Sequence, residues 1–110
     1  MNVNDQTMDK LKKAWDKADT LDVQALIRIS DPCGGLDFYP IAVDPVDEDT
    51  LLCIIDSVLS LEIAKVSAQD IFALHDSTGT HAYIDRNFAP VSAQKLYKKL
   101  KEKHGTTKDY

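Results

Sequence analysis

Cys33 is the residue whose surroundings most suggest nucleophilic chemistry. It lies in the turn-forming sequence Asp-Pro-Cys-Gly-Gly at residues 31–35, where backbone amides can approach a thiolate. A nucleophilic cysteine also needs a general base held by a third group, and nothing in the sequence brings one to this thiol. A cysteine in a hairpin turn is therefore the simpler interpretation, and no catalytic residue is predicted.

His75 and His81 flank a short polar segment. If that segment forms a hairpin, the two imidazoles face each other, and with Asp76 or Asp85 they provide three metal ligands. Their spacing matches no specific zinc motif, so exposed turn histidines are the simpler interpretation. We predict no metal and no cofactor. A small thiol- or metal-dependent enzyme using Cys33 with His75 and His81 is the alternative function.

Acidic residues dominate the middle of the chain. Residues 19–76 contain twelve Asp and Glu against two bases, whereas the 110-residue chain as a whole has a formal charge of −5. The densest acidic run, residues 44–49, lacks the glycine and the distant bidentate glutamate of a calcium loop. A solvated acidic surface is the interpretation that remains, and such a surface steers a cationic partner and speeds its association.

The leading hypothesis is a non-enzymatic protein-binding module that contacts a partner with a basic surface. Inhibitors encoded by phages or bacteria, immunity-type proteins and nucleic-acid mimics are the functional classes that such a surface suggests. The residues predicted to bind the partner are Asp31, Asp37, Asp44, Asp47, Glu48 and Asp49. The oligomeric state is not determined by the sequence.

Lysines near the C-terminus reverse the charge. Residues 92–110 hold six lysines against Glu102 and Asp109, and lysines of this kind can contact phosphates. The chain as a whole is acidic, however, and has only two arginines. We therefore interpret the lysines as the solvent-facing side of an amphipathic helix and expect no direct nucleic-acid binding.

Length and composition are typical of one globular domain. The chain has 110 residues, of which 44% are apolar. Its longest apolar run, residues 51–55, is far shorter than the roughly 18–20 residues of a membrane helix. The N-terminus has no signal-peptide pattern, and the two cysteines form no Cys-x-x-Cys motif. We expect a cytoplasmic protein that does not contact membranes.

The first helix and a hairpin are predicted from apolar spacing. Asp5 can cap a helix whose apolar residues recur every three or four positions, namely Met8, Leu11, Trp15 and Ala18. Residues 23–29 and 38–43 are β-prone and flank a turn, which predicts a β-hairpin. Pro40 has no backbone N–H, so the second strand should lie at a sheet edge or carry a bulge.

Residues 44–66 permit two interpretations. Asp44 and Pro45 can begin a helix with an apolar stripe, because Asp is an N-cap residue and Pro suits the first helical position. Alternatively, residues 47–49 form a turn between strands at 51–58 and 61–66. The strands are slightly favoured, because the apolar run continues without a helix stop.

Two further helices are predicted from a short repeat. The sequence Val-Ser-Ala-Gln occurs at residues 66–69 and again at 91–94, and Ser67 and Ser92 are both predicted N-caps. The helix that Ser67 caps should end by residue 76, and a strand should follow at 81–88. The last helix should run from residue 93 to His104, which would interact with the negative helix end, and Gly105 should terminate it.

Together these elements predict an α+β fold. We expect one domain over residues 1–110, with an antiparallel sheet of about four to five strands. An N-terminal helix, a short middle helix and a C-terminal helix pack on that sheet. Residues 1–4 and 106–110 are expected to be frayed termini.

Overall fold

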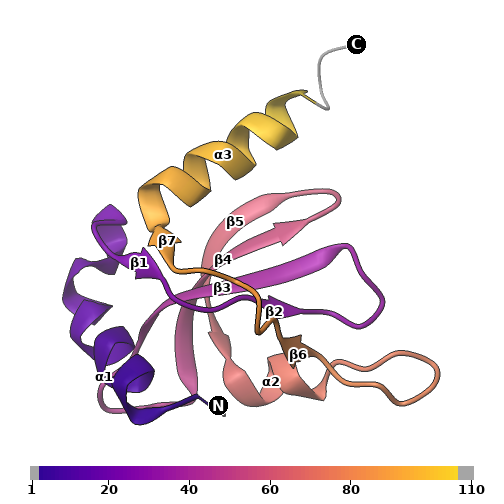
Figure 1. Cartoon of the computed structure of the whole chain (residues 1–110), viewed down its shortest axis with the longest axis horizontal. Helices are drawn as coiled ribbons and strands as arrows, with labels where there is room; N and C mark the ends of the chain where they lie inside the picture. Colours follow the sequence, from indigo (N-terminus) through magenta and orange to yellow (C-terminus); the bar gives the residue numbers. More distant parts are fainter. Residues whose placement is uncertain (1–2, 107–110) are drawn as a thin grey trace.

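The computed structural model of the chain describes residues 3–106 and has the α+β architecture that the sequence predicts (Figure 1). In chain order, its elements are α1 (Asp5–Ala14), the 3₁₀-helix η1 (Trp15–Thr20), β1 (Gln24–Ala25), β2 (Ile29–Ser30), β3 (Leu36–Val43), β4 (Thr50–Ser57), β5 (Leu61–Ser67), α2 (Ala68–Ala73), β6 (Tyr83–Ile84), β7 (Val91–Ser92) and α3 (Ala93–Thr106). None of the helices in this part of the chain is long and apolar enough to cross a membrane.

The main sheet has five strands in the order β5-β4-β3-β2-β6, with every neighbouring pair antiparallel. A second, two-stranded sheet joins β1 to β7. A hairpin around residues 31–35 is present as β2 and β3, but the prediction of its first strand is wrong: residues 23–29 form only β1, which pairs with β7, and the first residue of β2. Residues 44–66 form a loop followed by β4 and β5, so of the two interpretations the strands are correct and the helix is wrong.

Pro40 lies at a bulge in β3. The register between β3 and β4 shifts between Pro40 and Ala42, and this irregularity accommodates a residue that cannot donate to the sheet. β3 is nevertheless an interior strand, because β2 pairs with its first half. The prediction of an edge position or a bulge is therefore confirmed by the bulge.

Two apolar clusters lie on the two faces of the sheet. Residues such as Phe38 and Ile55 belong to the first cluster, with Leu11 of α1 and Ile71 of α2. Alternate residues of the same strands, such as Tyr39 and Ile54, belong to the second cluster, with Leu96 and Leu100 of α3. Because side chains alternate along a strand, β3 and β4 are covered on both faces.

The helices begin close to the predicted positions. Ser67 Oγ accepts a hydrogen bond from the amide of Asp70, and Ser92 Oγ accepts one from Lys95, so both predicted serine caps are confirmed. The cap of α1, however, is Asn4, whose side chain accepts from the amide of Thr7 at 2.8 Å. Asp5 is the first helical residue, where its negative charge favours the helix N-terminus.

Two predictions about the C-terminal third are wrong. The strand expected at 81–88 is reduced to β6, because the chain turns at Asp85, whose carboxylate accepts from the amide of Asn87. Gly105 does not end α3, since the helix continues to Thr106. His104 contacts Asp56 of β4, a partner that was not predicted. Of the predicted frayed termini, residues 1–2 and 107–110 lie outside the described part of the chain.

Candidate functional site

The acidic loop, residues 44–49, joins β3 to β4 and is held by its own carboxylates. Asp44 Oδ1 accepts hydrogen bonds from the amides of Val46 and Asp47, at 2.9 and 3.3 Å. Asp47 accepts from the amide of Asp49 at 3.1 Å and from the hydroxyl of Thr50 at 2.7 Å. Asp and Asn side chains commonly stabilise turns in this way. Asp44 therefore begins a turn and not a helix.

Two residues, Glu48 and Asp49, tie the acidic loop to the rest of the domain. Glu48 forms an ion pair with Lys12 of α1, and hydrogen bonding to Glu48 raises the pKa of Lys12. Asp49 accepts from the hydroxyl of Ser67 and from the amide of Gln69, at the start of α2. Those two hydrogen bonds lower the pKa of Asp49, so it remains ionised.

The other two predicted acids lie at the opposite end of β3. Asp37 follows the first residue of this eight-residue strand, which spans about 23–24 Å between its ends. Its carboxylate accepts from Arg28 Nη2 at 3.1 Å and from Ser30 Oγ at 2.9 Å. Asp31 accepts from the amide of Cys33 in the β2–β3 turn. The six predicted residues thus form two groups at opposite ends of the sheet.

Asp56 is a charged site that the sequence reasoning missed. Its side chain in β4 is only 5% exposed and accepts from Lys103 Nζ at 3.1 Å, while His104 Nε2 lies 2.6 Å from its other oxygen. It lies directly opposite Asp37, which forms an ion pair with Arg28. One signal could have identified Asp56: a carboxylate inside an apolar strand needs a partner.

A cavity of about 250 Å³ lies beside Asp37 and Asp56. Its lining includes Gly35, Asp37, Asp56, Lys103 and His104. Asp37 and Asp56 each pair with a basic side chain here. Asp37 pairs with Arg28, which lies just before β2, and Asp56 pairs with Lys103 of α3. The arrangement accounts for the docking of the end of α3 onto the sheet.

His75 and His81 are brought together, as the hairpin interpretation requires. They form an isolated antiparallel bridge, and their ring centres are 5.6 Å apart. The two acids considered as third ligands have other roles: Asp76 accepts from the amides of Thr78 and Thr80, and Asp85 pairs with Arg28. Within residues 3–106, no group of three or more His, Cys, Asp or Glu residues is arranged to hold a metal.

The two cysteines occupy different environments. Cys33 is exposed in the β2–β3 turn, whereas Cys53 is buried in β4, where burial raises the pKa of its thiol. Among residues 3–106, no hydrogen bond or ion pair joins Cys33 to His75 or His81. The alternative function, a small thiol- or metal-dependent enzyme using Cys33 with His75 and His81, therefore stays a prediction.

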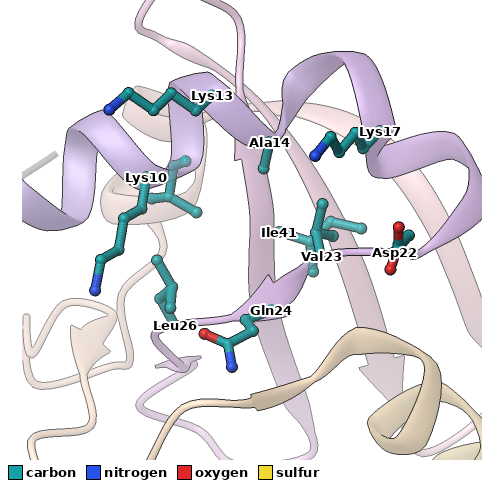
Figure 2. Close-up of a pocket in the computed structure, with 10 residues that line it drawn as sticks. Lys10, Lys13, Ala14, Lys17, Asp22, Val23, Gln24, Leu26 and Ile41 are labelled. Carbon is teal, nitrogen blue, oxygen red and sulfur yellow. The ribbon is translucent and has the colours of Figure 1, made fainter.

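A groove with a basic rim lies between α1 and β1 (Figure 2). Its cavity is about 240 Å³. The apolar lining comes from Ala14, Val23, Leu26 and Ile41. The basic residues are Lys10 and Lys13 of α1 and Lys17 of η1. Figure 2 shows Lys10 and Lys13 extending away from Val23 and Ile41. The charge of this rim is opposite to that of the acidic loop.

Comparisons with known proteins add nothing to this picture: no family model, no curated protein and no solved structure matches this chain.

Proposed function

We propose that this protein is a non-enzymatic protein-binding module whose acidic loop contacts a basic surface on a partner protein. The observation that carries the proposal is Val46, which is 96% exposed within a loop of four carboxylates. An apolar side chain surrounded by charged residues matches the usual composition of a protein interface, where an apolar centre has a polar rim.

The internal hydrogen bonds of the acidic loop support the proposal. Asp44 and Asp47 accept from backbone amides of the loop, and Asp49 accepts from the start of α2. A loop held in one conformation loses little conformational entropy when a partner binds. The loop can therefore present Val46 and its carboxylates without first becoming ordered.

The charge of the loop suits a basic partner. Of its four acids, Glu48 alone forms an ion pair within residues 3–106, which leaves Asp44, Asp47 and Asp49 without a compensating cation there. Uncompensated surface carboxylates attract a cationic surface and accelerate encounter, and this effect falls as ionic strength rises. Asp37 contributes less, because it forms an ion pair with Arg28 at the other end of β3.

Inhibitors of phage or bacterial origin, immunity-type proteins and nucleic-acid mimics are the functional classes that fit such a surface. We place the protein and its partner in the cytoplasm, where Cys33 and Cys53 would persist as the free thiols found here. In this proposal the protein contacts protein and does not contact nucleic acid directly.

The test is retention of partner proteins on the immobilised chain. Lysate of the source organism is passed over the wild-type protein, the variant Val46→Ser and the double variant Asp47→Asn/Glu48→Gln. We expect the retained proteins to be basic, to be lost from both variants, and to be released as ionic strength rises from about 0.05 to 0.5 M.

The control variant is Glu62→Gln, which removes an exposed acid from β5 outside the loop. It should retain the same proteins as the wild type. Retention that is equal for all variants, or that does not depend on ionic strength, would contradict the proposal.

A further inference from the structure

The segment between α2 and β6 carries two histidines that protein binding through the acidic loop does not use. It extends from the body of the domain as a loop (Figure 1). His75 and His81 lie at the base of this loop, where they form the antiparallel bridge that closes it. Residues directly opposite each other in such a bridge point to the same face, and both histidines are exposed to solvent.

The ring nitrogens of the two histidines have defined roles. His75 Nδ1 lies 3.1 Å from the carbonyl oxygen of Ala73, and His81 Nδ1 lies 3.1 Å from that of Phe72. A carbonyl oxygen can only accept, so each Nδ1 carries the proton and donates it. In the neutral imidazole, Nε2 is then the unprotonated nitrogen, which is the form that binds a metal.

The two carbonyls explain why the rings adopt this orientation. Phe72 and Ala73 are the last residues of α2, and the chain becomes extended at Leu74. Carbonyls in the last turn of a helix have no partner within the helix, and the two imidazoles supply the donors. A backbone carbonyl on the second nitrogen is also the contact that commonly orients a metal-binding histidine.

The separation of the rings fits one shared metal ion. With a metal–nitrogen distance of about 2.0–2.1 Å, two imidazoles on a tetrahedral ion have ring centres roughly 5–5.5 Å apart. The observed 5.6 Å is close to this value. Asp76 adds a negative charge beside His75, although its Oδ1 is engaged by Thr78 and Thr80.

We propose that His75 and His81 bind one divalent transition-metal ion of the Zn²⁺ type through their Nε2 atoms. Imidazole nitrogen suits Zn²⁺, Ni²⁺ and Cu²⁺ better than the hard cations Mg²⁺ and Ca²⁺. The protein supplies two ligands, because no group of three candidate ligands exists within residues 3–106. The other coordination positions are left to water or to a donor from a bound molecule.

The test is calorimetric titration of Zn²⁺ into the full chain carrying Cys33→Ser, which removes the exposed thiol as a competing ligand. On this background we compare His75→Asn and His81→Asn. The Asn side-chain amide can replace the Nδ1–H donor to the helix carbonyl but has no group at the Nε2 position. These variants therefore keep the capping of α2 and remove the metal ligand.

We expect one equivalent of Zn²⁺ to bind the parent protein, and either Asn variant to weaken binding by about tenfold or more. Nitrogen NMR of the parent should show both rings protonated at Nδ1 and only the Nε2 signals moving when Zn²⁺ is added. The thermal unfolding temperature of the parent protein should rise when Zn²⁺ is added, and that of the variants should not.

Two outcomes would overturn the proposal. Binding that is unchanged in both Asn variants would place the ion elsewhere. Absence of saturable binding to the parent would leave the two histidines with the capping of α2 as their only role. Neither outcome bears on the acidic loop, which lies at a different connection of the fold, so the two proposals can fail independently.

Discussion

At the scale of single residues, carboxylates in this protein accept two kinds of hydrogen bond, local and long-range. Asp44, Asp47 and Asp76 accept hydrogen bonds from backbone amides in their own turns. Asp56 instead accepts from residues 47 and 48 positions away in the sequence. The first kind is visible in the sequence, because Asp in a turn-forming segment predicts such contacts. The second kind depends on how the chain folds back.

Asp49 leads to a prediction about pH. Hydrogen bonds from Ser67 and Gln69 lower its pKa from the ordinary value of 3.8. A carboxyl group whose pKa is lower in the folded state stabilises the fold above its unfolded pKa, and this contribution is lost as pH falls through the folded pKa. We therefore expect Asp49→Asn to be less stable than the wild type above about pH 5, with the difference shrinking below about pH 4.

Urea unfolding at a series of pH values measures this difference. Asp16→Asn is the control for removal of one negative charge, since Asp16 is an exposed acid of η1. A difference between the wild type and Asp49→Asn that stays constant down to about pH 2 would contradict the prediction.

At the scale of elements, α3 is attached to the sheet by an apolar and a charged contact. Leu96 and Leu100 pack into the second apolar cluster, and one turn further His104 reaches Asp56. The three helical residues are spaced by four positions, so they lie on one face of α3. That spacing is visible in the sequence, but the partner of His104 is not.

A double-mutant cycle tests the contact between α3 and β4. Removing one partner of a buried hydrogen-bonded pair leaves the other unsatisfied, so we expect Asp56→Asn and His104→Gln each to lower the free energy of unfolding by about 1–3 kcal/mol. Because the two residues are in contact, the double variant should lose less than the sum.

Urea denaturation gives the four free energies of the cycle. Lys101→Gln, on the exposed side of the same helix, should stay within about 0.5 kcal/mol of the wild type. Additive effects of Asp56→Asn and His104→Gln would show that the two residues do not interact in solution.

At the scale of the whole molecule, the two apolar clusters depend on the same two strands. β3 and β4 give alternate side chains to each cluster, so neither cluster can open while the other keeps its packing. We expect one cooperative unfolding transition for the chain.

Three probes can follow that transition in urea. Circular dichroism reports the secondary structure, Trp15 fluorescence reports the second cluster, and the reactivity of buried Cys53 reports the first. Their midpoints should coincide. A separate transition for Trp15 would indicate that η1 and α3 unfold as an independent unit.

Much of the fold can be predicted from local signals. Ser67 and Ser92 precede helices, Pro40 lies at a bulge, and the apolar runs of residues 51–66 form strands. The errors occur where local signals compete. Asn4 and Asp5 are both good N-caps, and the chain uses the first of them. Gly105 is tolerated inside a helix although it resembles a stop.

In the candidate sites too, some features can be predicted from the sequence and others depend on the tertiary structure. The sequence by itself determined the acidic loop, because residues 44–49 are contiguous and their charges stay together however the chain folds. The tertiary structure alone decided that Asp37 lies far from this loop and opposite Asp56, and that His75 meets His81 across a bridge. Apolar periodicity and helix capping act over a few residues. Contacts between residues far apart in the sequence depend on strand order and register, which are selected by the packing of the whole chain.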